Sequence, residues 1–252
     1  MVQIRPRLSP EEFRLVEYFR NRDLIYSELP KDKRILVVGD LHTPFTRKGY
    51  LEHCQQVAVK YNTNHTIFIG DVIDNHYSSF HDSDPDGLSA NDELDAATDV
   101  LSEWHRAFPN ADVILGNHDM IVLRQIFKAG ISKRWIIKFS DVLEVPSWKF
   151  IEQIEYDGVK YIHGLKGGAV NGAITKAVGR GKSIVQGHWH SKSWVRWHVT
   201  DVSRIFAMQV GCGVDEKTYA MAYHTDPMER WILSCGVVLE NGQLPIVEPM
   251  RL

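Results

Sequence analysis

The chain is poor in cysteine, in net charge and in targeting signals. It holds 3 cysteines among 252 residues, and no two of them form a C-x-x-C pair. An odd number without framework spacing argues against a disulfide-stabilised extracellular fold and predicts reduced thiols in a cytoplasmic setting. The formal net charge is only -3. A protein coated in basic residues for nucleic acid is therefore excluded, although a local basic patch stays open.

No segment resembles a signal peptide or a membrane span. The first ten residues lack an apolar core, and no run approaches the roughly 20 apolar residues that cross a bilayer. Internal repeats, low-complexity stretches and Pro/Gly/Ser-rich linkers are also missing. We therefore predict a single domain over residues 1–252, with no membrane partner. Residues 1–30 are expected to form a helical appendage, whose helix begins at Ser9-Pro10.

Periodic patterns in the two halves of the chain predict an α/β fold. In the first half, short apolar runs at 34–38, 66–69 and 112–115 alternate with helical patterns at 48–61 and 92–108. This order predicts a parallel sheet built from right-handed crossovers. The second half is richer in strands, which we expect at 159–162, 183–186, 194–200, 204–210, 231–239 and 243–247. The last two flank Asn241-Gly242, a strong hairpin signal, and two packed sheets with helices outside are the predicted architecture.

What the chain does have is 12 histidines, several of them in short motifs with carboxylates at predicted strand ends. The motifs are Gly39-Asp40-Leu41-His42, Gly70-Asp71-Val72-Ile73-Asp74, Gly116-Asn117-His118-Asp119 and Gly187-His188-Trp189-His190, with a lone His163 between the last two. The carboxyl ends of parallel strands meet at one edge of a sheet, so the motifs are expected to converge. Their side chains suit divalent metals and are enough for two ions.

Each motif taken alone has an ordinary structural interpretation. A D-x-H pair arises easily by chance, and His163 at a strand end could be a hydrogen-bonded structural histidine. The Gly116–Asp119 segment could be a polar turn. Several strand-end motifs in one order are hard to explain as turns, and the combination therefore indicates a functional site.

In this order the motifs resemble those of the calcineurin-like metallophosphoesterases, whose pattern is D-x-H, G-D-x-x-D, G-N-H-D/E, a single His and G-H-x-H. The resemblance spans Asp40 to His190. It implies a four-layer αββα sandwich of two mixed sheets flanked by helices, with two metals at the strand ends. It also implies a metal-dependent phosphoric ester hydrolase, in which a metal-bridging hydroxide attacks the phosphate ester.

The resemblance also assigns roles residue by residue. One metal would be held by Asp40, His42, Asp71 and His190, and the other by Asp71, Asn117, His163 and His188. His118 would be the catalytic histidine, and Asp119 the residue that orients or charges its imidazole. We expect two divalent metal ions. Mixed His, Asp and Asn sites accept several metals, so Mn²⁺ is the first expectation and Fe, Zn, Co or Ni stay open.

The ester is indicated by a departure from the family's protein Ser/Thr phosphatases, which carry G-D-x-x-D-R-G. Here Asn75 and His76 follow Asp74, and the arginine that would help bind a monoester dianion is missing. The pattern is more similar to bacterial and phage phosphodiesterases and nucleases, whereas purple acid phosphatases fit poorly because their tyrosine ligand is absent. A phosphomonoesterase acting on a small molecule or a phosphoprotein is the alternative. A non-catalytic scaffold is disfavoured because His118 and every ligand position are present.

Two further regions suggest substrate contacts. Trp189, Trp194 and Arg196 could stack on and contact a nucleotide or single-stranded nucleic acid. An ordinary half-buried strand gives the same pattern, with Val195, Trp197 and Val199 facing the core. The loop at 75–91 is long for a βα connection, and His76 and His81 are candidate substrate contacts there.

The same long loop matches the spacing of a calcium-binding loop. Its carboxylates are Asp82, Asp84 and Asp86, with Glu93 at the twelfth position. Pro85 interrupts the pattern and no clear helix precedes it. The favoured interpretation is an acidic turn that caps the following helix, while bound calcium stays open.

Overall fold

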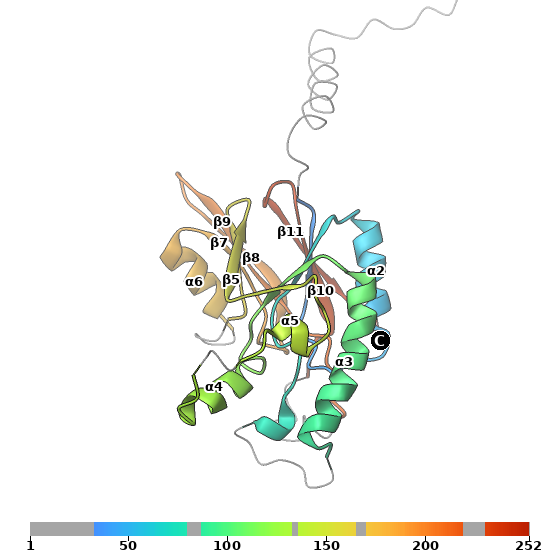
Figure 1. The fold of residues 1–252 in the computed structure, drawn as a ribbon. Coiled ribbons are helices and arrows are strands. Elements are labelled where there is room, and N and C mark those ends of the chain that lie inside the picture. Colours follow the sequence, from blue (N-terminus) through green and yellow to red (C-terminus); the bar gives the residue numbers. More distant parts are fainter. Residues whose placement is uncertain (1–32, 80–86, 133–135, 165–169, 219–229, 252) are drawn as a thin grey trace, which may run out of the picture. The chain divides into compact units, whose positions relative to one another are not determined.

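Two mixed sheets, one of six strands and one of five, form the centre of the part of the chain described in this computed structural model (Figure 1). The described residues are 33–79, 87–132, 136–164, 170–218 and 230–251. Both sheets combine parallel and antiparallel pairs, as the sequence predicts. His81 and the carboxylates of Asp82, Asp84 and Asp86 lie outside the described residues.

The first sheet has the order β11-β10-β1-β2-β3-β4. Its parallel strands are β1 (Ile35–Val38), β2 (His65–Phe68), β3 (Ala111–Ile114) and β4 (Lys149–Ile151). The hairpin of β10 (Ser234–Leu239) and β11 (Leu244–Pro249) pairs antiparallel with β1. The crossovers contain α2 (Tyr50–Lys60), η1 (His76–Ser78), α3 (Ala90–Ala107), α4 (Ile121–Lys128) and α5 (Phe139–Val142). Parallel pairing puts the carboxyl ends of β1, β2 and β3 at one edge.

The second sheet has the order β5-β6-β7-β9-β8. Its strands are β5 (Gln153–Tyr156), β6 (Val159–Ile162), β7 (Ser183–Gln186), β8 (Ser193–Val199) and β9 (Arg204–Val210). Helix α6 (Gly172–Arg180) makes the crossover between the parallel strands β6 and β7. This crossover delivers the carboxyl ends of β6 and β7 to a common edge.

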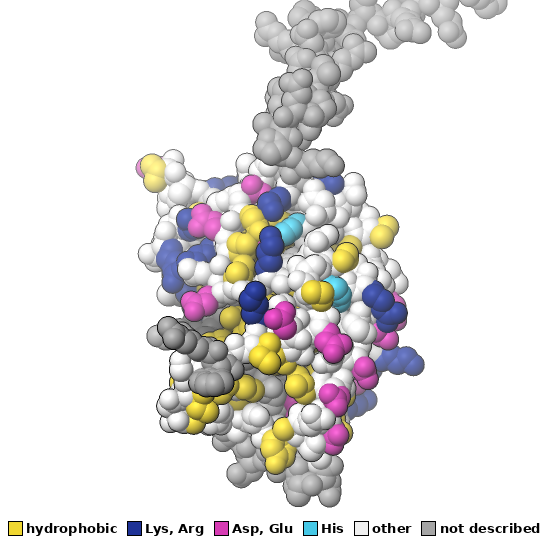
Figure 2. Space-filling model, in the orientation of Figure 1, with side chains coloured by type: hydrophobic (Ala, Val, Ile, Leu, Met, Phe, Trp, Pro, Cys, Tyr) yellow, Lys and Arg dark blue, Asp and Glu magenta, His cyan; other side chains and the backbone are white. Residues whose placement is uncertain are grey.

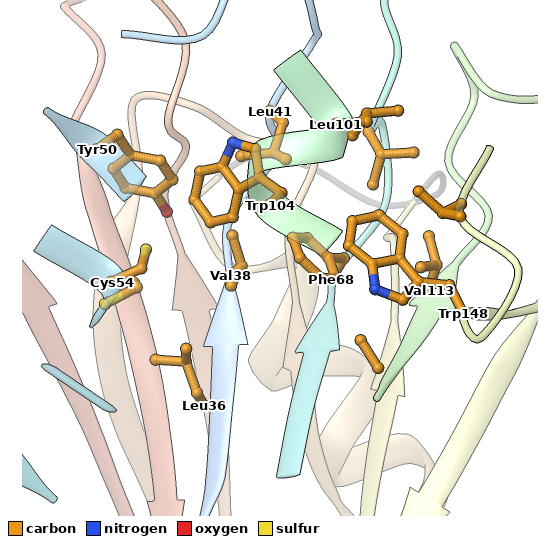
Figure 3. Close-up of a cluster of buried hydrophobic side chains, with 14 of the residues drawn as sticks. Leu36, Val38, Leu41, Tyr50, Cys54, Phe68, Leu101, Trp104, Val113 and Trp148 are labelled. Carbon is orange, nitrogen blue, oxygen red and sulfur yellow. The ribbon is translucent and has the colours of Figure 1, made fainter. Parts of the chain in front are cut away.

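Alternating side chains of β1 define the layers. Leu36 and Val38 pack with Trp104 in a buried cluster between the first sheet and helices α2 and α3 (Figure 3). Ile35 and Val37, which point to the opposite face, pack with Phe206 and other residues of the second sheet. The outer face of that sheet is covered by α6 through Ala173 and Ala177, which pack on Ile184 and Ala207. The layers therefore run helix, sheet, sheet, helix, and the predicted αββα sandwich is confirmed.

Strand β8 departs from the predicted burial. Val195 packs against the cluster between the sheets, as expected, but Trp197 is 41% and Val199 64% exposed. The strand lies at the edge of its sheet, so its second half has a neighbouring strand on one side only. There Trp197 contacts Phe206, with ring centroids 5.5 Å apart. The alternative of an ordinary half-buried strand is therefore confirmed for Val195, and Trp197 lies against Phe206 of the same cluster, but neither Trp197 nor Val199 is buried.

The described residues belong to one compact unit, Lys33–Leu252. Residues 1–32 lie outside the described residues, so the single domain over 1–252 and its helical appendage over 1–30 stay predictions. Within the described part, no helix combines the length and the apolar character needed to span a membrane. Figure 2 shows that Lys, Arg, Asp and Glu side chains are interspersed with hydrophobic ones on one face of the molecule.

Candidate metal centre

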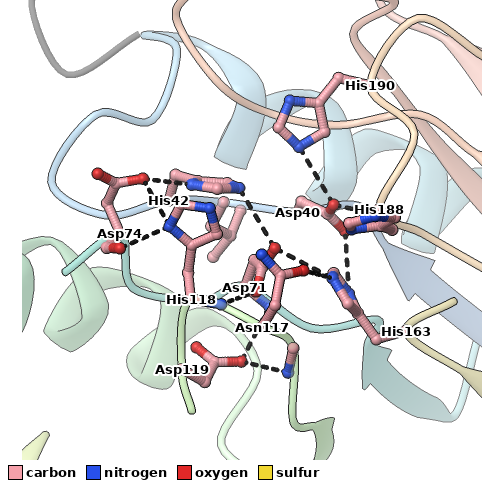
Figure 4. Close-up of polar contacts among 12 residues, drawn as sticks. Asp40, His42, Asp71, Asp74, Asn117, His118, Asp119, His163, His188 and His190 are labelled. Atoms are coloured by element: carbon pink, nitrogen blue, oxygen red, sulfur yellow. Dashed lines mark hydrogen bonds and ion pairs between the residues drawn. The ribbon is translucent and has the colours of Figure 1, made fainter. Parts of the chain in front are cut away.

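The polar motifs meet at one edge of the two sheets (Figure 4). Each follows a strand: Asp40 and His42 come after β1, Asp71 after β2, Asn117 and His118 after β3, His163 after β6, and His188 and His190 after β7. The structure therefore brings all seven predicted metal ligands together, from five strands of two different sheets.

Close packing explains the glycines that precede these side chains. A Cβ atom at Gly70 would collide with the His163 ring, and one at Gly116 would collide with the Asp71 carboxylate. The chain then turns sharply, since His42 and Asp71 both have φ 47 and His188 has φ 72. Left-handed backbone at non-glycine residues costs of order 1–3 kcal/mol each and concentrates at functional sites.

The first group of donors consists of Asp40, His42 and His190, whose ligand atoms lie within 4.8 Å of one another. His190 Nε2 is 3.2 Å from Asp40 Oδ2. Asp40 Oδ1 and His42 Nε2 are buried without a hydrogen-bond partner in the described structure. Such orphaned atoms are costly unless a ligand satisfies them. Carboxylate and imidazole donors this close together fit a divalent cation.

The second group consists of Asp71, His163 and His188, which satisfy the same distance limit of 4.8 Å. His163 Nε2 lies 3.0 Å from Asp71 Oδ2 and 3.0 Å from Asn117 Oδ1. His163 Nδ1 is 3.0 Å from the Ile69 carbonyl oxygen. A proton on Nδ1 would be donated to that carbonyl and would leave the Nε2 lone pair for a metal.

Asp71 belongs to the second group but also reaches His42 of the first. Its Oδ2 is 3.6 Å from His42 Nε2 and 3.0 Å from His163 Nε2, while Oδ1 accepts the His118 backbone N–H at 2.7 Å. A third cluster, His42, Asp71 and His118, overlaps both groups. A carboxylate shared in this way is what two neighbouring cations need as a bridge.

The carboxylates and imidazoles of the two groups shift one another's pKa values. Burial opposes ionisation of Asp71, but His163, His118 and His42 hold its pKa well below the usual value. Burial lowers the pKa of His163, yet Asp71 and Asp40 outweigh it and raise that pKa to about 10. Burial and the neighbouring His163 lower the pKa of His188 to about 4. Metal binding would therefore displace a proton from His163.

His118 lies beside both groups and contacts Asp74. Its Nδ1 is 2.7 Å from the Asp74 carbonyl oxygen and 3.3 Å from Asp74 Oδ1. The same Oδ1 is 2.5 Å from His42 Nδ1, so one buried carboxylate orients two imidazoles. The prediction missed Asp74 as a site residue. Its signal was the second carboxylate of the Gly70–Asp74 motif, three residues after Asp71.

Asp119 does not occupy the position predicted for it. Its carboxylate accepts backbone N–H groups of Gly116, Asp71 and Val72 at 2.7, 2.9 and 3.0 Å. Burial and the Asp71 charge raise the pKa of Asp119 to about 6, against these amide bonds. Asp119 therefore ties the loops after β2 and β3 together, and the His118 ring is oriented by Asp74 instead. The reason is local, because adjacent side chains diverge.

The predicted substrate contacts have mixed outcomes. Trp189 lies at the centre, edge-to-face with His188 at 5.1 Å between ring centroids. Arg196 is engaged within the fold, since Nη1 donates to Asn171 Oδ1 at 2.6 Å and the guanidinium stacks 4.3 Å over Trp194. His76 is only 6% exposed.

The twelfth residue of the calcium-like pattern is also engaged elsewhere. Glu93 is buried and accepts the backbone N–H groups of His76 and Tyr77 at 2.8 and 3.2 Å. Ser89 caps α3 by accepting the Asp92 N–H. Capping of α3 by the acidic residues 82, 84 and 86 stays a prediction, because they lie outside the described residues. Calcium binding itself stays a prediction.

Comparison with protein-family models defines the class. Residues 33–204 match the model described as calcineurin-like phosphoesterase, and the chain belongs to this family. No curated protein matches the chain. Similar solved structures include Vps29 from Chaetomium thermophilum, with TM-score 0.41, 11% identity and coverage of 86% of this chain and 97% of that one. Vacuolar Protein Sorting 29 from Cryptosporidium parvum has TM-score 0.40, 13% identity and coverage of 88% and 98%.

Proposed function

We propose that the protein is a dinuclear metal-dependent phosphoesterase whose substrate is a phosphodiester. One observation carries this proposal. Six carboxylate, amide and imidazole side chains gather with a shared Asp71, and a further histidine, His118, lies beside them. Asp40, His42 and His190 would hold one cation together with Asp71. Asn117, His163 and His188 would hold the other.

Bound cations would activate water and neutralise the phosphoryl oxygens, and Mn²⁺ is the first metal to test. The chain's own contribution is to orient and protonate. His118 Nδ1 faces the Asp74 carbonyl oxygen, so Nδ1 carries a proton and Nε2 is left for the substrate. The Asp74 carboxylate stabilises the charged imidazole. A proton on Nε2 would then pass to the leaving oxygen.

Asn75 supports the preference for a diester. It occupies the position of the arginine found in the protein phosphatases of the family, and its Nδ2 donates to the His118 carbonyl oxygen at 2.9 Å. The Asn75 amide is neutral and is hydrogen-bonded to the backbone, so it provides no positive charge to bind a monoester dianion. A diester carries one charge fewer and needs less compensation. This supports our proposal of a phosphodiesterase or nuclease, with a nucleotide or single-stranded nucleic acid as substrate.

The test is a paired assay of the Mn²⁺-loaded protein with bis-p-nitrophenyl phosphate and p-nitrophenyl phosphate, followed by single-stranded DNA. We expect faster hydrolysis of the diester. A strong preference for the monoester would replace the diester assignment with a phosphomonoesterase. Failure of a protein that contains two cations to hydrolyse either ester would reject the enzyme altogether.

A further inference from the structure

A network of side-chain hydrogen bonds connects the segments that carry His163 and His188. Gln186, at the end of β7, and Gln209, in β9, are both fully buried in the second sheet. Gln186 Nε2 donates to Gln209 Oε1 at 2.8 Å, and Gln209 Nε2 donates to the Gly187 carbonyl oxygen. Gly187 directly precedes His188. The Gln209 end of this hydrogen-bond network therefore holds the backbone next to a candidate metal ligand.

Lys176 of α6 forms the other end. Its Nζ donates to Gln186 Oε1 at 2.9 Å and to the Gly164 carbonyl oxygen at 3.1 Å. Gly164 directly follows His163, and a Cβ atom at Gly164 would lie 3.1 Å from the Gln186 carboxamide carbon. The Gln186 amide is thus packed against the loop that carries His163. Gln186 also pairs with Ile162, directly before His163, through the parallel ladder of β6 and β7.

The carbonyl groups that these side chains bind at the two ends of the network are those of Gly164 and Gly187. In the sequence they adjoin His163 and His188, which belong to the second group, although the His188 N–H also donates to Asp40 Oδ2 of the first group at 2.8 Å. The first group has different supports. The Asp40 carbonyl oxygen accepts the Gly213 N–H at 2.8 Å, and the His190 carbonyl oxygen accepts the Ile232 N–H at 2.9 Å.

Burying two glutamines in the sheet, with a half-buried lysine amine beside them, is costly unless each polar atom is paired. Here the donors and acceptors alternate without a break from the Gly164 carbonyl to the Gly187 carbonyl. Three apolar side chains could fill the same space without polar atoms to pair. The presence of Lys176, Gln186 and Gln209 instead points to a role in positioning the segments that they bind. We propose that Lys176, Gln186 and Gln209 are positioning residues for the second cation, and that this cation can be lost separately from the first. The inference rests on the proposed dinuclear centre.

The test uses Lys176→Met, which keeps the length of the side chain but removes its donors. Residues that orient metal ligands typically change metal affinity by 10–100-fold when mutated. We expect the second Mn²⁺ to bind about 10-fold or more weakly in this variant, while the first binds as in the wild type. Calorimetric titration of the chelator-treated protein measures both affinities. Electron paramagnetic resonance adds a signature, because a lone Mn²⁺ gives the spectrum of an uncoupled ion.

Lys182→Met is the matched control. Lys182 lies just beyond α6 and pairs with Glu155 at the surface, at 2.7 and 2.8 Å, so both affinities should stay at the wild-type values. Lys176→Arg keeps donors at the same place and should restore part of the second affinity. Gln209→Leu removes the hydrogen bonds at the other end of the network. It provides the same test if Lys176→Met does not fold.

The outcomes separate this inference from the proposed function. A wild-type protein that binds fewer than two cations would reject both. A wild-type protein that binds two cations, with variants that lose both equally or neither, would reject the positioning role alone. Selective loss of the second cation in Lys176→Met and Gln209→Leu would support it.

Discussion

Asp and His side chains are in contact at both the amino edge and the carboxyl edge of the first sheet's parallel strands, but of these two clusters only the one at the carboxyl edge leaves buried polar atoms unpaired among the described residues. At the amino edge, Asp112 Oδ2 lies 2.7 Å from His65 Nε2 and accepts the Tyr156 hydroxyl at 2.6 Å. Its imidazole and hydroxyl partners complete the cluster within the protein. At the carboxyl edge, Asp40 Oδ1 and His42 Nε2 are buried without such partners among the described residues.

The difference favours a structural role for the Asp112 cluster and a ligand-binding role for the Asp40 cluster. Buried polar atoms are normally paired within the fold, and exceptions concentrate where a ligand or ion is needed. Asp112 is 4% and Asp40 0% exposed, so burial alone does not separate the two clusters. The unpaired atoms do, together with the shared carboxylate of Asp71.

Two matched substitutions, one at each edge of the first sheet, should give the largest difference in cation binding. Asp71→Asn removes the shared carboxylate, and we expect binding of both cations to weaken and kcat/KM on bis-p-nitrophenyl phosphate to fall by about 10³-fold, since metal clamps supply several kcal/mol. Asp112→Asn should lower stability but leave the cation content unchanged. Metal analysis and the diester assay measure both variants. Equal cation loss in the two variants would erase the distinction between the edges.

Within the carboxyl edge, His118 is expected to act on the substrate without binding a cation. His118→Ala should retain both cations and lose about 10²–10⁴-fold in kcat, the usual contribution of a general acid. His105→Ala is the control, because His105 lies on α3 and contacts Ser147 at 2.7 Å. Loss of cations in His118→Ala would make His118 a ligand instead.

Asp74 and Asp119 should have opposite signatures. Asp74→Asn weakens the partner of His42 and His118, and we expect activity or metal affinity to fall by about 10–100-fold. Asp119→Asn disturbs the backbone amide bonds that join two loops, and we expect the free energy of unfolding to fall by about 2 kcal/mol. Diester kinetics and urea denaturation of both variants measure these effects. The reverse order would return Asp119 to the position beside His118.

The smallest expected effect concerns calcium. Glu93 is committed to the amides of His76 and Tyr77, so adding Ca²⁺ at physiological salt should give no calorimetric heat. Glu93→Gln should leave that result unchanged. A saturable heat in the wild type that is absent from the variant would show that the acidic segment binds calcium.

The site was more predictable from sequence than its internal contacts. Gly-Asp and Gly-Asn dipeptides after short apolar runs placed Asp40, Asp71 and Asn117 at one edge, because parallel strands leave no other arrangement. β6 was predicted at 159–162 and occupies Val159–Ile162. Local order along a parallel sheet therefore carries over from sequence to structure.

Contacts that depend on loop paths were not predictable. Asn75 adopts φ 54 directly after Asp74, and the second carboxylate of the Gly70–Asp74 motif does not by itself show that Asp74 rather than Asp119 meets the His118 ring. The burial of Trp197 depends on β8 lying at a sheet edge, which alternation alone does not reveal. Helix α6 was also missed, although Lys176 on it contacts the loop after His163.

The most direct measurement is anomalous diffraction from crystals of the Mn²⁺-loaded protein. The account predicts two anomalous peaks about 3.5–4 Å apart, one beside Asp40 and His190 and the other beside His163 and His188, with Asp71 touching both. A single peak, or peaks away from Asp71, would contradict it.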